Sequence, residues 1–192
     1  MPNIRYDWSL EEVSNIYNSP LIEIIRKASS IHSKNFDNSI FLNTLVSVKT
    51  GACPEDCAYC AQSARYNTKI STQILSEEDI ISQAKKAIAN GASRICLSMS
   101  GKEIKDNDDL TKIINAAKKI RQLDVNVCCT LGTINDASIV KKLKKAGITA
   151  YNHNLDTSEN FYPKIITTRK YQDRINTINL LIKEKLNYCS GG

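Results

Sequence analysis

The amino-acid sequence predicts an α/β protein in which a parallel sheet is assembled from repeated β/α units. Three observations indicate this class: extended stretches alternate with helical stretches after residue 44, the connections are short, and the strands carry apolar side chains at every second position. The 192 residues suffice for one domain with a hydrophobic core. Because 42% of the residues are apolar and 24% are charged, the composition is that of an ordinary globular protein.

Periodicity and capping residues define the expected elements. Two helices at 8–18 and 21–33 form an N-terminal helical extension, residues 1–40, and the sheet domain occupies 41–192. Strands are expected at 44–49, 94–99, 125–131, 148–155 and from 186 onward. The helices that follow the strands are expected at 76–90, 108–123, 136–146 and 168–185. Ser76 and Asp79 have the spacing of a capping box, and Gly91 and Gly147 follow the ends of two helices.

Each expected strand has one apolar face and one polar face, because successive side chains point to opposite sides of a sheet. In 125–131, for example, Val125, Val127 and Leu131 alternate with Asn126 and Thr130. The polar positions of the five strands are Ser47, Lys49, Arg94, Cys96, Ser98, Ser100, Asn126, Cys128, Thr130, Asn152, Asn154, Asp156, Asn187 and Cys189. Burying so many polar groups without partners is costly. We therefore expect a barrel whose interior holds a cofactor; an antiparallel sheet with one wet face is the alternative.

Charge and hydropathy exclude several classes of function. The net charge is +6, but the lysines are scattered through helical stretches, which is typical of solvated helix faces and not of a nucleic-acid surface. No stretch approaches the roughly 20 apolar residues of a membrane span, and the N-terminus lacks a signal-peptide pattern. We expect a cytoplasmic protein with no membrane partner. Seven cysteines, an odd number, argue against a disulfide framework and favour metal or cluster ligation.

Three of the cysteines lie close together in the stretch GACPEDCAYCAQ, residues 51–62. Cys53, Cys57 and Cys60 have the spacing C-x3-C-x2-C. Structural zinc sites and most four-iron clusters use four protein ligands. Three thiolates would leave one iron of a cluster open to a substrate amine and carboxylate. The alternatives are three reduced thiols and a zinc site.

The cysteine spacing, with Tyr59 directly before the third cysteine, resembles the signature of the radical S-adenosylmethionine (SAM) enzymes. The segments SVKTGACPEDCAYCAQSARYNT, VCCTLGT, AYNHNLDTS, FYPKIITTRKYQDR and NYCSGG resemble, in the same order, those members that insert sulfur into dethiobiotin. The resemblance covers essentially the whole chain. It implies a (β/α)8 TIM-type barrel, of which this chain holds about four and a half β/α units.

The resemblance also implies which residues bind the cofactors. Cys53, Cys57 and Cys60 would hold a [4Fe–4S] cluster, and Cys96, Cys128 and Cys189 would hold a [2Fe–2S] cluster. The other implied contacts are Tyr59, Asn154 and Asp156 to SAM, Asn152 and Asn154 to the ureido ring of the substrate, and Arg94 beside the second cluster. Cys129 and His153 fall on the apolar parity of their strands, so we expect both to have structural roles.

The reaction implied by the resemblance is radical sulfur insertion. An electron donor such as flavodoxin reduces the [4Fe–4S] cluster, SAM is cleaved to a 5′-deoxyadenosyl radical, and this radical takes hydrogen from dethiobiotin. The carbon radical then takes sulfide from the [2Fe–2S] cluster. Members of this group are usually homodimers.

Two rival functions stay open at this point: another radical SAM reaction, such as that of a maturase or a methylornithine synthase, and a non-catalytic zinc protein. A complete barrel typically needs about 250 residues. We therefore expect the 192-residue polypeptide by itself to be inactive.

Overall fold

The computed structural model describes residues 4–37, 39–68 and 73–191. Its internal contacts group the chain into two compact units, Met1–Ile40 and Phe41–Gly192. The first unit contains α1 (Leu10–Tyr17) and α2 (Leu21–Asn35). A capping box begins α1, since Ser9 Oγ accepts from the Glu12 N–H at 3.1 Å and Glu12 Oε2 accepts from the Ser9 N–H at 2.9 Å. No residue of either helix is buried.

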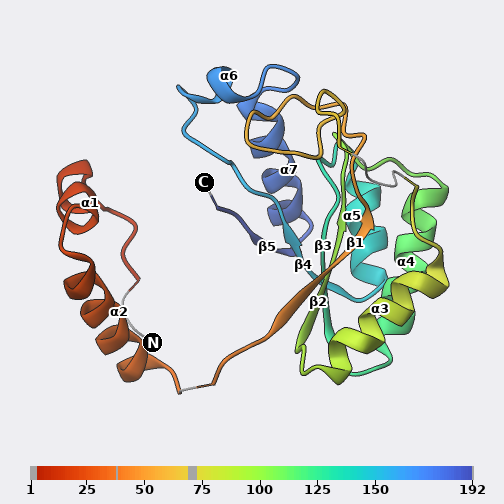
Figure 1. Ribbon diagram of the computed structural model, residues 1–192, viewed down its shortest axis with the longest axis horizontal. Coiled ribbons are helices and arrows are strands. Elements are labelled where there is room, and N and C mark those ends of the chain that lie inside the picture. The colour runs from red at the N-terminus through yellow and green to blue at the C-terminus, as the bar shows by residue number, and fades with distance from the viewer. Residues whose placement is uncertain (1–3, 38, 69–72, 192) are drawn as a thin grey trace. The chain divides into compact units, whose positions relative to one another are not determined.

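The second unit is a five-stranded parallel sheet with helices between its strands (Figure 1). The strands are β1 (Asn43–Lys49), β2 (Arg94–Met99), β3 (Asn126–Thr130), β4 (Ile148–Asn152) and β5 (Asn187–Cys189). The helices are α3 (Glu77–Ala89), α4 (Asp108–Arg121), α5 (Ala137–Lys145), α6 (Tyr162–Ile165) and α7 (Tyr171–Lys183). Each strand pairs in parallel with the next strand along the chain.

The sequential order β1-β2-β3-β4-β5 is that of a TIM-type barrel, because each β/α unit adds its strand beside the previous one. The predicted fold class, an incomplete barrel of this type, is confirmed. The antiparallel alternative is wrong, since all four strand pairings are parallel.

Burial follows the predicted alternation of faces. Ile95 and Leu97 on β2, and Val127 and Cys129 on β3, are fully buried in one apolar cluster with side chains from α3, α4 and α5. On the other face, Cys96, Ser98 and Thr130 are only partly buried. The predicted packing role of Cys129 is confirmed, because its side chain belongs to this core. The helices therefore cover the apolar face and leave the polar face toward the barrel interior.

The main differences from the predicted elements lie between β4 and α7. Strand β4 ends at Asn152, three residues earlier than predicted, and the chain reaches a left-handed conformation at Asp156 (φ 70°). The short helix α6 was not predicted, and α7 begins at Tyr171 instead of at residue 168.

At α3 the Ser76 cap forms, but the Asp79 carboxylate accepts from the Ser76 hydroxyl at 2.8 Å and not from its backbone N–H.

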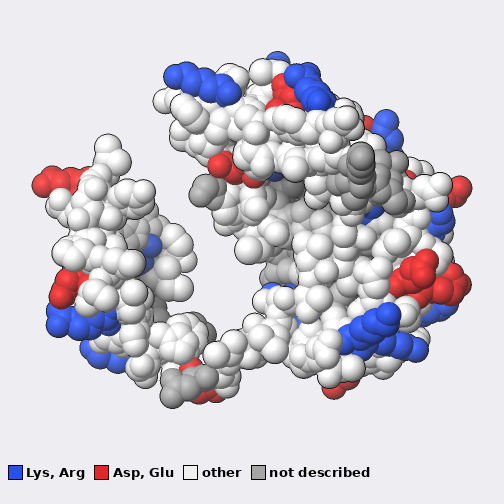
Figure 2. All heavy atoms as spheres, in the orientation of Figure 1, with Lys and Arg blue, Asp and Glu red and all other residues white. Residues whose placement is uncertain are grey.

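Charged side chains mix over the helical surface. On the face seen in Figure 2, an acidic group and a basic group lie next to each other over α3 and α4, and no continuous basic surface is seen. One such pair is Lys119–Glu77, at 2.5 Å. This mixture agrees with solvated helix faces. In the described ranges, no helix combines the length and the apolar character that a bilayer-spanning segment needs.

Leu97 offers a direct test of the core. Its side chain is fully buried at the centre of β2, whereas Leu45 on β1 is 59% exposed. We expect Leu97→Ala to lower the free energy of unfolding by about 3 kcal/mol, because it removes buried methyl groups and leaves a cavity. Leu45→Ala, the matched control, should change it by less than about 0.5 kcal/mol. Urea titration followed by far-UV circular dichroism measures both; equal effects would contradict the described core.

Candidate functional site

A pocket of about 210 Å³ lies at the carboxyl ends of the strands. This is the end at which TIM-type barrels carry their active sites. Its lining comes from segments far apart in the sequence: Cys53, Cys57, Tyr59, Cys60, Gln62, Ser98, Met99, Ser100, Gly101, Thr130, Gly132, Asn152, His153, Asn154, Asp156, Arg169 and Arg174. The pocket thus brings all three cysteines of the C-x3-C-x2-C stretch together with the Asn and Asp residues predicted to bind SAM and substrate.

Residues 51–66, here called the cysteine loop, fold over the carboxyl ends of the strands and lie beside α6 and the start of α7 (orange in Figure 1). The loop closes on itself, because Cys53 N–H donates to Gln62 O at 3.0 Å and Ala64 N–H donates to Cys53 O at 2.8 Å. The buried Ser100 hydroxyl donates to Gly51 O at 2.6 Å and anchors the loop to the end of β2. These bonds give the three cysteines a defined backbone.

The cysteine sulfurs lie in a largely dry environment. Cys53 and Cys57 are buried and Cys60 is partly buried. Cys57 packs with Tyr162 and Ile166, which the α6 segment supplies. Burial raises the pKa of Cys57, while Arg169 and Arg174 act in the opposite direction. The net effect favours the protonated thiol, so a metal that binds here would have to displace the Cys57 proton, because the thiolate is the form that binds metals.

The opposite wall of the pocket follows β4. Arg174, from the first turn of α7, donates to Asn154 O at 2.7 Å and to the Tyr162 hydroxyl at 2.8 Å, and forms an ion pair with Asp156. Asp156 adopts φ 70°, which is uncommon for a residue other than glycine. Strained backbone of this kind is concentrated at functional sites. The ion pair fixes the Asp156 carboxylate at the pocket.

The two asparagines of this wall differ in what their side-chain oxygens contact. In the part of the chain that the structure describes, Asn152 Oδ1 is buried and accepts no hydrogen bond. Asn154 Oδ1 already accepts from the Gly191 N–H at 3.0 Å. Tyr59 lines the same pocket as Asp156, and burial together with the Asp156 carboxylate raises the pKa of this tyrosine. The predicted SAM and substrate residues therefore share one pocket.

The second group of cysteines is brought together only in part. Cys96 and Cys128 are direct register partners on β2 and β3. A hydrogen bond from Cys128 lowers the pKa of Cys96, with Thr130 and Arg94 acting in the same direction, and the shared proton raises the pKa of Cys128. Cys189 pairs with Asn152 on β4, two residues farther along the strand direction, and is exposed. All three lie on the same face of the sheet.

Two further residues considered in the sequence analysis, His153 and Arg94, lie near these groups. His153 is 3% exposed, and burial together with Arg174 and Arg169 lowers its pKa to about 3. It is therefore neutral at physiological pH, but it lines the pocket and its buried Nε2 has no hydrogen-bond partner among the described residues, so its structural role stays a prediction. Arg94 lies at the amino end of β2, in register with Asn126. Its positive charge acts to lower the pKa of both Cys96 and Cys128.

Sequence reasoning missed four charged residues: Glu55 and Asp56 in the cysteine loop, and Arg169 and Arg174 near α7. Glu55 and Arg169 form a buried ion pair with 2.6 Å between Oε2 and Nε. The sequence held one indication of these contacts, because two adjacent acids lie in a loop whose thiols must be shielded from water. Buried carboxylates need cationic or hydrogen-bonding partners, but the sequence could not say which of 26 basic residues supplies them.

Gly132 is required where the pocket wall turns after β3. It has φ +87°, and a Cβ there would lie 2.6 Å from Lys102 O. We expect Gly132→Ala to lower the free energy of unfolding by about 2–4 kcal/mol, because backbone strain and a clash with main-chain atoms add. Gly91→Ala is the matched control, since Gly91 has φ +90° but its Cβ would meet only the flexible Leu42 side chain at 3.5 Å.

The control should lose only the strain, roughly 1–2 kcal/mol. Urea titrations of the two variants separate the clash from the strain. If Gly132→Ala is no worse than Gly91→Ala, the close approach of residues 102 and 132 is not rigid.

The comparisons with known proteins agree with this geometry. The radical SAM superfamily pattern matches residues 47–192. The chain is 45% identical to a biotin synthase of Nostoc punctiforme over 100% of this chain and 58% of the relative. It is 45% identical to a biotin synthase of Schizosaccharomyces pombe over 98% of this chain and 53% of the relative. The chain thus spans about half the length of the curated relatives it matches.

Among solved structures, the FeFe-hydrogenase maturase HydG from Carboxydothermus hydrogenoformans superposes with a TM-score of 0.80 at 20% identity, covering 96% of this chain and 44% of the maturase. A likeness at this identity concerns the fold alone. Fold and sequence agree, and the chain belongs to the radical SAM superfamily. The curated relatives named above are all biotin synthases.

The superfamily implies a [4Fe–4S] cluster and SAM as cofactors. The cysteine loop fits the cluster, because three thiols from one loop line a pocket beside two guanidinium groups. The pocket fits SAM, because carboxylate, amide and guanidinium groups face the same space as the thiols. Within the described residues, no three His, Cys, Asp or Glu side chains converge as they would around a single metal ion.

Proposed function

We propose that the protein takes part in radical SAM-dependent conversion of dethiobiotin to biotin, the final step of biotin synthesis, in the cytoplasm. The observation that carries this proposal is the 45% identity to biotin synthases over 98–100% of this chain. Identity at this level extends beyond the cysteine loop and includes the whole sheet. The same proposal includes an electron donor such as flavodoxin and a homodimeric assembly. Both rest on family resemblance.

In the proposed enzyme, Cys53, Cys57 and Cys60 hold the [4Fe–4S] cluster. When bound, the cluster would supply the electron for radical chemistry on SAM. Asp156, held by Arg174, would accept hydrogen bonds from the ribose hydroxyls, and Asn154 and Tyr59 would line the SAM site. The roof formed by the cysteine loop would limit the access of water.

Asn152 supports the assignment of the substrate. Its Oδ1 atom is buried beside the pocket and lacks a donor in the described structure. An unpaired buried acceptor is costly, so a ligand N–H group that reaches it gains affinity. The ureido ring of dethiobiotin carries such N–H groups. Asn152, with Asn154, would therefore orient the substrate by hydrogen bonds and leave its carbon atoms free to react.

A [2Fe–2S] cluster held by Cys96, Cys128 and Cys189 is the proposed sulfur source. The face shared by the three cysteines and the direct register pairing of Cys96 with Cys128 support it. The charge of Arg94 would offset the negative charge of the thiolates. Since Cys189 is exposed on the last strand, the site needs further protein to cover it.

A chimera tests the function directly. In it, this chain replaces the matching N-terminal part of the Nostoc punctiforme biotin synthase, which supplies the remaining strands. Anaerobically reconstituted chimera should form biotin from dethiobiotin, with SAM and a reducing system. The 192-residue polypeptide alone should form none, because its β1 and β5 edges are unpaired in the described sheet.

Variants of the chimera separate the two clusters. Cys128→Ala should still release 5′-deoxyadenosine from SAM but form no biotin, and Cys129→Ala should keep both activities. Failure of a folded, cluster-loaded chimera to turn over dethiobiotin would contradict the proposed substrate. Zinc without sulfide in the anaerobically purified protein would contradict radical SAM chemistry altogether.

A further inference from the structure

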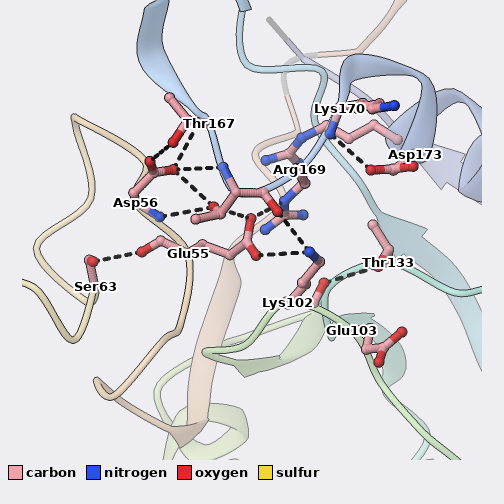
Figure 3. Close-up of polar contacts among 12 residues, drawn as sticks. Glu55, Asp56, Ser63, Lys102, Glu103, Thr133, Thr167, Arg169, Lys170 and Asp173 are labelled. Carbon is pink, nitrogen blue, oxygen red and sulfur yellow. Dashed lines mark hydrogen bonds and ion pairs between the residues drawn. The ribbon is translucent and has the colours of Figure 1, made fainter. Parts of the chain in front are cut away.

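Two adjacent acids of the cysteine loop make contacts that the proposed chemistry does not use. The carboxylates of Glu55 and Asp56 contact the segment 167–169, which precedes α7 (Figure 3). The Glu55 side chain is 2% exposed and the Asp56 side chain 7%. Burying two neighbouring carboxylates costs free energy unless each is paired and hydrogen-bonded. Their partners therefore indicate what they do.

Asp56 binds the backbone and the hydroxyl groups of two threonines. It accepts from Thr167 N–H at 2.9 Å and Thr168 N–H at 3.2 Å, and also from both threonine hydroxyls. In the other direction, the Asp56 N–H donates to Thr168 Oγ1 at 3.2 Å. These bonds occupy the free N–H groups ahead of α7 and join two segments more than 100 residues apart in the sequence.

Glu55 adds a buried ion pair. Its Oε2 atom accepts from Arg169 Nε at 2.6 Å and lies 3.0 Å from Thr168 Oγ1, whose single hydroxyl proton it shares with Asp56. Lys102, from the loop after β2, lies 3.8 Å from Glu55 Oε1 and donates to Thr168 O at 2.7 Å (Figure 3). Three loops, after β1, β2 and β4, therefore meet at this cluster of contacts, which we call the acid latch: Glu55, Asp56, Lys102, Thr167, Thr168 and Arg169.

The acid latch joins the two walls of the pocket. On one side, Glu55 and Asp56 lie between Cys53 and Cys57 in the sequence. On the other side, Arg169 lines the pocket and Arg174, five residues later, holds Asp156. A buried ion pair adds little net stability, but removing one partner leaves an unpaired buried charge. A pair of this kind is therefore better explained by the geometry it enforces than by the stability it adds.

We infer that Glu55 and Asp56 are positioning residues: through the acid latch they set the distance between the three thiols and the wall that carries Asp156 and Arg174. This inference rests on the proposed function, since the groups so positioned would be the [4Fe–4S] cluster and SAM. The latch would make the cysteine loop and the α7 segment move as one body. Loss of either acid should loosen both segments without removing any of the three thiols.

Hydrogen exchange of the 192-residue chain, measured by mass spectrometry without cofactors, tests the mechanical part. The variants are Glu55→Gln, Asp56→Asn and Glu55→Gln combined with Arg169→Gln. The control is Glu77→Gln, which breaks the Glu77–Lys119 pair between α3 and α4. Amides of residues 51–66 and 166–174 should exchange about tenfold faster in both single variants. The double variant should regain part of the protection, because it removes both charges of the pair.

Cluster spectroscopy tests positioning against a merely structural role. After anaerobic reconstitution, the single variants should hold as much iron and sulfide as the Glu77→Gln control. The change that SAM causes in the electron paramagnetic resonance spectrum of the reduced cluster should need about tenfold more SAM. Because Arg169 also lines the pocket, the double variant is judged on exchange alone. If Glu55→Gln does not fold, Asp56→Asn carries both comparisons.

The inference would be overturned if the single variants match the Glu77→Gln control in both hydrogen exchange and SAM response. It would also be overturned if the SAM response is lost while the exchange of residues 51–66 and 166–174 stays unchanged. Failure of the proposed function gives a different pattern. In that case the unaltered chain takes up no cluster or shows no SAM response, while faster exchange in the single variants still reports the latch.

Discussion

Alanine at Cys53, Cys57 or Cys60 is expected to abolish cluster assembly on the cysteine loop. Each thiol lines the same pocket, and the loop closes on itself around Cys53, so no neighbouring cysteine of the loop can replace a missing one. The reconstituted chain should lose about four iron atoms and the matching sulfide per polypeptide. Iron and sulfide analysis, together with visible absorption, measures the loss.

Cys129→Ala provides the matched control for these substitutions. Cys129 is fully buried among the apolar side chains under the helices, and burial raises its pKa well above the ordinary value for a thiol. It should therefore remain protonated and take no part in ligation, and its loss should leave the iron content unchanged. Full iron content in a loop variant, or loss of iron in the control, would refute the assignment of the two kinds of cysteine.

The alternation of side chains along the strands was enough to predict both faces of the sheet. Cys96 and Cys128 shared a parity with Ser98 and Thr130, while Cys129 did not, and the structure places these residues on opposite faces accordingly. Parity is a local property, because side-chain direction follows from backbone pleating. Register between strands is not local, which is why the offset of Cys189 by two residues was not foreseen.

The segment between β4 and α7 could not be predicted for a different reason. The predicted helix began at residue 168, but Thr168 and Arg169 are engaged by Asp56 and Glu55 from the cysteine loop. A tertiary contact more than 100 residues away in sequence thus delays the start of α7 to Tyr171. Local propensity is a weak prior that such contacts override. For the same reason, sequence reasoning found the thiols but missed their charged neighbours.

Arg174→Gln is expected to be the most damaging change on the β4 side of the pocket. Arg174 is held by Asn154 O, the Tyr162 hydroxyl and Asp156, and its side chain is only 9% exposed. Glutamine cannot span these three partners, and it leaves the Asp156 carboxylate, 12% exposed, without its cation. Removing one partner of a buried pair costs about 3–5 kcal/mol, so the free energy of unfolding should fall by that amount.

Urea titration followed by far-UV circular dichroism measures this loss, and Lys119→Gln is the control. Lys119 pairs with Glu77 on the helical surface, where its side chain is 58% exposed, so its removal should cost less than about 1 kcal/mol. Adding Asp156→Asn to Arg174→Gln should restore part of the stability, because no unpaired carboxylate then remains. SAM response should stay lost in that double variant, since both groups that shape the pocket wall are gone. Equal stability of Arg174→Gln and Lys119→Gln would mean that water reaches Asp156 freely and that the wall is not held by this pair.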